Sequence, residues 1–221
     1  GLLGKPHPAD GVLDSIDRET AAVFWEPPRF TEINMEWVTR LRDRCDATGT
    51  VLIFDEIVYG FRWATAGSQT LTGIEPDLAC FSKALGNGYA VGCVCGSAAV
   101  MNDHALVVSS TFGGDRVGLA AAMGVLDSHQ GGATLFLHDR ADKLWAILHK
   151  AISGTVVRFE GYPVHWRFLC DTEDQMDRFL DSCLDGGVLV HRHANNANTT
   201  MTDEVIHRVG EVVHKAAIDA G

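Results

Sequence analysis

The sequence predicts an α/β protein, with a mainly parallel sheet and flanking helices in its first part and a smaller α/β domain in its last part. Two short apolar runs at residues 20–25 and 50–54 enclose one helical pattern, which gives the order strand, helix, strand. Strands joined in this way are usually parallel and covered on both faces. A long helical stretch follows, and strands and helices then alternate again toward the end of the chain.

The first part is divided by its turn and capping residues. Pro27 and Pro28 stop the first strand. Asn34 is a good N-cap for a helix whose apolar residues recur at helical spacing, and Gly49 suits its C-terminal end. The strands expected in this part comprise residues 20–25, 50–54, 78–81 and 89–96.

The second part begins with a helical pattern from Arg116 to about residue 148, broken at Gly131-Gly132. Strands are then expected at 156–159, 165–169 and 188–190, helices at 172–184 and from Thr202, and a loop at 195–198. In the last helix, Val205 and Ile206 are expected to face the core. The pattern predicts a large domain at residues 1–127, connecting helices at 128–152 and a small domain at 153–221.

Charge and composition exclude several classes of protein. The chain has 18 Lys and Arg against 29 Asp and Glu, so its net charge is −11. No basic stripe is present, which argues against nucleic acid or an anionic membrane as a partner. No apolar run approaches the roughly 18 residues of a membrane span, and no secretion signal is visible. The six cysteines have no CxxC pair or framework spacing, which favours reduced thiols and a cytoplasmic compartment.

Two charged residues follow neighbouring predicted strands. Asp55 comes directly after the run at 50–54, and Lys83 follows the run at 78–81. Ligands of parallel α/β sheets bind beyond the carboxyl ends of the strands, so both side chains are expected at one crevice. Taken alone, Asp55 is more often a strand-end cap and Lys83 a solvated loop lysine.

His191 and His193, without a third candidate ligand, do not make a metal site.

Several motifs in order carry a resemblance to a known family. They are AAVFWEP (21–27), LIFDEI (52–57), GFR (60–62), PDL (76–78), SKALGNGY (82–89), SSTFGGD (109–115) and GLAAA (118–122). Together they resemble the class III aminotransferases, which are pyridoxal-phosphate enzymes of fold type I. Within that family they are most similar to the glutamate-1-semialdehyde aminomutase branch. The match is close over about residues 20–127 and faint from there to the C-terminus.

The resemblance implies a role for each matched residue. Lys83 would form the Schiff base with the cofactor aldehyde and later move the substrate's proton. Asp55 would keep the pyridine nitrogen of the cofactor protonated, and Ile57 would pack against one face of the ring. For Ile57, an ordinary core position is an equally simple interpretation.

Thr111 matches a threonine that reaches the cofactor phosphate of the neighbouring subunit, with backbone N–H groups of Phe112 and Gly113 beside it. From the sequence alone, a helix cap is an equally good interpretation of Thr111, and the resemblance favours the phosphate role. Glu26 and Arg62 also match family positions, and a structural ion-pair network is favoured there over catalysis.

The resemblance also implies that an N-terminal half is lacking, since family members are about twice as long and place their main phosphate-binding cup there. The favoured hypothesis is a shortened aminotransferase that acts on a small-molecule amine donor and a carbonyl acceptor, as a homodimer or higher homo-oligomer. One alternative is a non-catalytic remnant or half-enzyme that needs another chain. The other is an aminomutase of the glutamate-1-semialdehyde type.

Overall fold

The computed structural model describes residues 10–102, 111 and 113–221. The chain divides into two compact units. Unit 1 holds the described residues up to Pro28 together with Glu32–Gly131, and unit 2 holds Arg29–Thr31 and Gly132–Gly221. This division into compact units does not test the domain boundaries that the sequence predicts at residues 127 and 152, and these boundaries stay a prediction.

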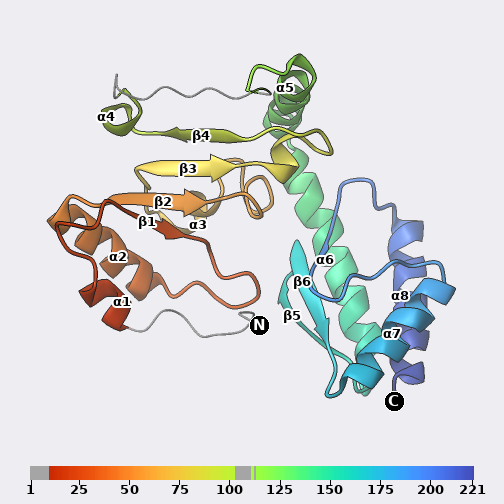
Figure 1. Cartoon of the computed structure of the whole chain (residues 1–221). Helices are drawn as coiled ribbons and strands as arrows, with labels where there is room; N and C mark the ends of the chain where they lie inside the picture. Colours follow the sequence, from red (N-terminus) through yellow and green to blue (C-terminus); the bar gives the residue numbers. More distant parts are fainter. Residues whose placement is uncertain (1–9, 103–110, 112) are drawn as a thin grey trace. The chain divides into compact units, whose positions relative to one another are not determined.

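Unit 1 is built on a four-stranded sheet in the order β1-β2-β3-β4 (Figure 1). The strands are β1 (Ala22–Trp25), β2 (Val51–Asp55), β3 (Leu78–Phe81) and β4 (Cys93–Gly96). The first three run parallel, as the strand-helix-strand order predicts, and β4 runs antiparallel to β3. The strand expected at 89–96 is wrong in its first half. Tyr89 belongs to a tight turn there, and its N–H donates to the carbonyl of Gly86 at 3.0 Å.

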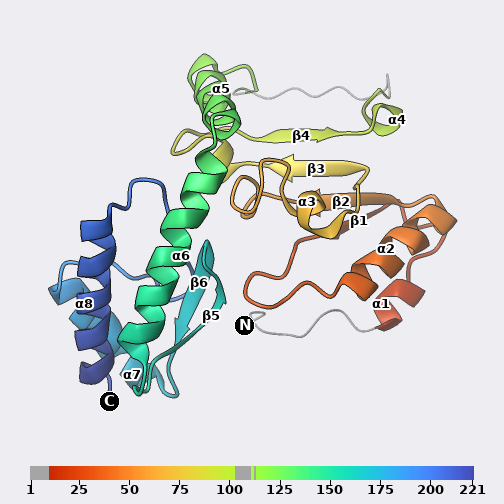
Figure 2. The ribbon, with the colours of Figure 1, turned by 180° about the vertical axis from the view of Figure 1, so that it is seen from behind.

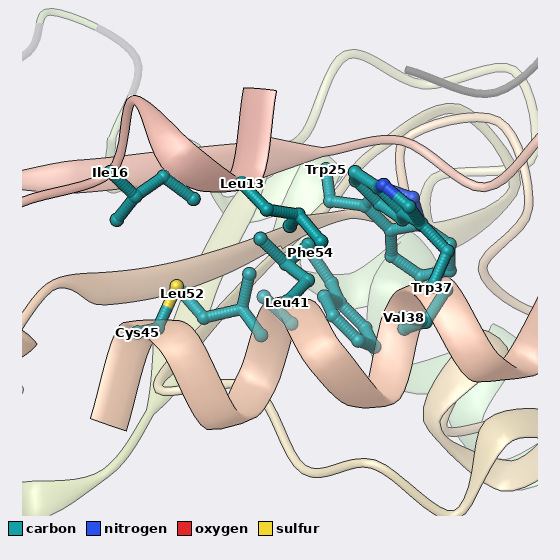
Figure 3. Close-up of a cluster of buried hydrophobic side chains, with 10 residues drawn as sticks. Leu13, Ile16, Trp25, Trp37, Val38, Leu41, Cys45, Leu52 and Phe54 are labelled. Carbon is teal, nitrogen blue, oxygen red and sulfur yellow. The ribbon is translucent and has the colours of Figure 1, made fainter. Parts of the chain in front are cut away.

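Helix α2 (Met35–Thr48) connects β1 to β2, and local signals set both of its ends. The Asn34 side chain accepts the Trp37 N–H at 3.0 Å, and Gly49 has the left-handed φ of 77° that glycine tolerates. Its apolar stripe packs against the sheet and against α1 (Asp10–Asp14), a short helix that the sequence did not reveal. Figure 3 shows this core, which contains Leu13, Ile16, Trp25, Trp37, Val38, Leu41, Cys45, Leu52, Phe54 and Ala79.

The remaining elements of unit 1 are mostly short. They are α3 (Ser68–Thr72), the 3-10 turn η1 (Lys83–Leu85), α4 (Ala98–Met101) and α5 (Arg116–Gln130). Helix α5 packs through Ala122 against Phe61 and Leu85, and so covers the turn that follows β3.

Unit 2 combines three helices with a small antiparallel sheet in the order β5-β6-β7. Its elements are α6 (Ala133–Ile152), β5 (Arg158–Tyr162), β6 (His165–Leu169), α7 (Glu173–Asp185), β7 (Asn195–Asn196) and α8 (Asp203–Asp219). Figure 2 shows α6 and α8 side by side. Gly210 permits this approach, since a Cβ there would overlap the side chain of Ile147. No helix in the described ranges is long and apolar enough to cross a membrane.

Several expectations for unit 2 are wrong. The strand expected at 156–159 starts two residues later, at Arg158, and continues to Tyr162. Residues 188–190 form no strand, because the Val188 N–H donates to the Cys183 carbonyl at 2.9 Å and closes the end of α7. The expected loop at 195–198 contains β7, whose Asn196 side chain bonds to Nδ1 of His165 at 2.7 Å. Val205 is exposed, because it lies in the first turn of α8, before the buried stripe that starts at Ile206.

Candidate active site

Asp55 is the last residue of β2, where a run of buried apolar residues meets a polar edge. Its partner in the register with β3 is Cys80. The half-buried carboxylate accepts the Ile57 N–H on Oδ1 at 3.0 Å. Within the described part of the chain it forms no ion pair, and its Oδ2 accepts no hydrogen bond. One carboxylate oxygen is therefore oriented by the backbone, and the other can meet a ligand.

Lys83 lies two residues beyond the end of β3, as the first residue of η1. The Ser82 hydroxyl before it donates to the Val91 carbonyl at 2.8 Å, which fixes the start of the turn. Lys83 has a φ of 47°, a left-handed conformation that residues with a Cβ rarely adopt. Its side chain is exposed and forms no ion pair with any carboxylate among the described residues. The amine is thus presented to solvent from a strained backbone.

The sheet brings Asp55 and Lys83 to one edge. They follow the carboxyl ends of neighbouring parallel strands, and the Glu56 N–H extends the pairing by donating to the Cys80 carbonyl at 2.9 Å. Burial raises the pKa of the Cys80 thiol, and the negative charge of Asp55 adds to the shift. The Cys80 thiol, three residues before Lys83, is therefore close enough to the Asp55 carboxylate for its charge to affect the thiol pKa.

The loop after β2 contains a residue that sequence reasoning missed. Glu56 is buried, with its carboxyl group against Gly67 and Ser68. A lone acidic residue after a strand gives no signal of burial, because its partner follows twelve positions later. Arg62 lies in the same loop, and burial lowers the pKa of its guanidinium group. Glu26 follows β1, and its side chain is exposed. The ion-pair network predicted for Glu26 and Arg62 stays a prediction.

The residues predicted for the cofactor phosphate lie before α5. Thr111 and Gly113 are exposed, and Phe112 lies outside the described residues. The N-cap of α5 is Asp115, whose carboxylate accepts the Gly118 N–H at 2.7 Å. A carboxylate therefore already occupies the end of this helix that attracts anions. The phosphate role of Thr111, Phe112 and Gly113 remains a prediction.

The structure shows no candidate metal centre within its described ranges, that is, no group of three or more His, Cys, Asp or Glu side chains placed to hold an ion. The rings of His191 and His193 are 5.7 Å apart, and both are exposed.

Comparison with known proteins settles the family. The sequence profile named "Aminotransferase class-III" matches residues 9–202. The chain belongs to the class III aminotransferases. Members of this family depend on pyridoxal phosphate.

Two curated relatives illustrate the match. An acetylornithine aminotransferase of Methanosarcina mazei is 29% identical over 229 residues, which cover 94% of this chain and 55% of the relative. A glutamate-1-semialdehyde 2,1-aminomutase of Clostridium botulinum is 32% identical over 134 residues, which cover 57% of this chain and 31% of the relative. This class III chain thus spans about half the length of the first of these relatives and less of the second.

Solved structures have the same fold. The internal aldimine form of the Sphingopyxis sp. MTA144 FumI protein superposes with a TM-score of 0.84 at 26% identity, covering 95% of this chain and 54% of that chain. A transaminase with pyridoxal phosphate bound gives a TM-score of 0.86 at 22% identity and covers 55% of that chain. The described residues therefore have the fold of type I transaminases, and they correspond to about half the length of those chains.

The site residues fit pyridoxal phosphate by their chemistry. The group offers an aldehyde, for which Lys83 provides an exposed amine, and a ring nitrogen, for which Asp55 provides an unoccupied carboxylate oxygen. The turn after Lys83 needs glycine at position 86, since a Cβ there would overlap the Tyr89 carbonyl oxygen. Described residues thus offer groups that suit the reactive end of the cofactor, whereas a role of Thr111, Phe112 and Gly113 at its phosphate end stays a prediction.

Proposed function

We propose that this chain binds pyridoxal phosphate through Lys83 and Asp55 and moves an amino group between a small-molecule amine or amino acid and a carbonyl acceptor. The observation that carries this proposal is the pair itself. An amine and a carboxylate, neither of them ion-paired within the described residues, follow the carboxyl ends of two adjacent parallel strands. Membership of the class III family supports the same reaction class.

When bound, pyridoxal phosphate supplies an aldehyde that reacts with amines and a protonated ring that accepts electron density from the substrate. Lys83 would hold the cofactor at its aldehyde through Nζ, and the same amine would move a proton at the substrate carbon. The Ile57 N–H fixes the Asp55 carboxylate through Oδ1. Oδ2 would hold a proton on the ring nitrogen of the cofactor, and the Ile57 side chain would pack against one face of the ring.

A cofactor titration tests this proposal. Added pyridoxal phosphate should give a visible absorbance band from the lysine-bound cofactor in the wild type and in Lys215→Ala, a control that removes an exposed lysine of α8. Lys83→Ala should abolish the band. Asp55→Asn should keep binding but lose most of the transamination rate, because a neutral amide does not hold the ring proton. A band that survives Lys83→Ala would refute the assignment.

A second candidate is a half-enzyme that completes its site only with another chain. Exposed apolar side chains favour association with a second chain, whether another copy or a different protein: Phe24 is 67% exposed on β1, Val94 is 51% exposed on β4, and Met123 is 66% exposed on α5. Apolar side chains on sheet edges and on an outer helix face promote association. We propose a homodimer or higher homo-oligomer, in which Thr111 would reach the cofactor phosphate of a neighbouring subunit. Light scattering with and without cofactor distinguishes the homo-oligomer from a monomer that needs a different chain.

An aminomutase reaction is the third candidate, supported by the 32% identity to the Clostridium botulinum glutamate-1-semialdehyde 2,1-aminomutase. Incubation with an amine donor and pyruvate separates the two reactions, because only an aminotransferase forms alanine.

We also propose a cytoplasmic location. Its support is that all six cysteines are free thiols, as expected in a reducing compartment.

A further inference from the structure

Glu56, the residue after Asp55, joins the end of β2 to two other segments. It is only 1% exposed. Its backbone N–H donates to the Cys80 carbonyl at 2.9 Å, and its own carbonyl accepts the Gly60 N–H at 2.7 Å. The backbone of Glu56 therefore connects β2 both to β3 and to the turn that follows β2.

The side chain of Glu56 reaches the start of α3. Its Oε1 accepts the Ser68 N–H at 2.7 Å and also accepts the Ser68 hydroxyl. Gly67, the N-cap residue of α3, has a φ of 70° and no capping side chain of its own. A Cβ at Gly67 would lie 2.7 Å from Oε1. The carboxyl group thus occupies the space of a side chain at position 67 and closes the loop that begins at Glu56.

The hydrogen bonds of this carboxyl group are one-sided. Both donors reach Oε1, while Oε2 is buried and has no hydrogen-bond partner in the described part of the chain. A buried carboxyl oxygen without a hydrogen-bond partner has lost its hydration, which costs free energy and disfavours the charged form. Burial raises the pKa of Glu56; the hydrogen bonds from Ser68 oppose the shift, and the charge of Asp55 adds to it. The carboxyl group therefore holds the loop through Oε1 alone.

The closed loop also contacts the turn that contains Lys83. Phe61, in the middle of the loop, has a φ of 68° and packs in one buried cluster with Leu85 of η1. Its ring lies 5.7 Å from the ring of Phe81 at the end of β3. The loop therefore begins directly after Asp55, and its middle supports the backbone that presents Lys83.

We propose that Glu56 is a positioning residue: its carboxyl group bonds to Ser68 and so closes the loop from Glu56 to Ser68 (the clasp), and the closed loop holds Asp55 and Lys83 at the positions that the cofactor requires. This inference rests on the proposed function, because it assigns Glu56 a role toward the Asp55–Lys83 pair. Gln at position 56 should preserve this role, because its amide oxygen can accept the same two hydrogen bonds from Ser68.

Amide hydrogen exchange of the protein without cofactor tests the clasp. Glu56→Ala should reduce the protection of the Ser68 amide about tenfold, the equivalent of one lost hydrogen bond. Glu56→Gln should keep that protection, as should the matched control Glu75→Gln at an exposed glutamate of the same unit. Ser68→Ala, which removes only the hydroxyl, tests the same contact if Glu56→Ala does not fold. Unchanged Ser68 protection in Glu56→Ala would overturn the clasp.

Absorbance titration with pyridoxal phosphate then tests positioning. Glu56→Gln should bind like the wild type, and Glu56→Ala and Ser68→Ala should raise the dissociation constant about tenfold. Loss of Ser68 protection without a change in the dissociation constant would overturn the positioning role. If the wild type itself gives no band, the proposed function fails and the positioning role fails with it. The exchange result still decides whether the clasp exists.

Discussion

The backbone at Lys83 provides a prediction that needs no cofactor. Its φ of 47° lies in the left-handed region. That conformation costs a residue with a Cβ about 1–2 kcal/mol and costs glycine nothing. Glycine also gains freedom in the unfolded chain, which offsets about 0.4–1 kcal/mol relative to alanine. Lys83→Gly should therefore be more stable than Lys83→Ala by about 0.8 kcal/mol, although both variants lose the same amine.

Thermal unfolding and urea titration measure this difference. It corresponds to about 2–3 °C in Tm for a protein of this size. The same pair of substitutions at Lys143, inside helix α6, is the matched control. There the order should reverse, because glycine is about 1 kcal/mol less favourable than alanine in a helix interior.

A Lys83→Gly variant that is no more stable than Lys83→Ala would refute the strained backbone. Strain at a reactive residue persists only when its surroundings enforce it. The prediction therefore also tests whether the packing of Phe61 and Leu85 holds the Lys83 turn in place.

Two further predictions concern the ends of the parallel strands. Asp77→Ala should lower the free energy of unfolding by about 2 kcal/mol, because its carboxylate accepts the N–H of buried Leu52 at 2.7 Å. Asp46→Ala, at an exposed ion pair, should change it by less than about 0.5 kcal/mol, and equal losses in urea titrations would contradict this account. Burial, with the charge of Asp55, raises the folded-state pKa of Glu56, so the folded protein keeps a proton that the unfolded chain releases at its ordinary pKa of about 4.3. The wild type should thus lose stability relative to Glu56→Gln as pH rises from about 4 toward the folded-state value. A difference that is independent of pH would show that folding does not raise the pKa of Glu56.

Local signals predicted the parts of the fold that depend on neighbouring residues. Asn34 and Gly49 set both ends of α2 as expected, and the two apolar runs around that helix form parallel strands. Strand β7 could not be predicted, because its residues pair with His165 and Trp166, about thirty positions earlier. The chain between 188 and 190 has strand-like residues, but its backbone closes α7 instead.

The candidate site, like the fold, was predicted only where the signals are local in the sequence. Asp55 and Lys83 were predicted because strand ends and motif spacing are visible in the sequence. The left-handed backbone of Lys83 and the burial of Glu56 were not, because both depend on packing in three dimensions. The cap that Asp115 forms on α5 is a local feature, and an acidic residue directly before a helical pattern could have revealed it.

Chemical trapping tests the central claim most directly. The chain has five lysines, at positions 5, 83, 143, 150 and 215. After incubation with pyridoxal phosphate and reduction with borohydride, peptide mass analysis should find the cofactor on Lys83, at one equivalent per chain. Retention on Lys83 at limiting cofactor, with the other lysines unlabelled, is the predicted result. Label spread evenly over the exposed lysines, or absent from Lys83, would contradict the assignment of this sheet edge as a cofactor site.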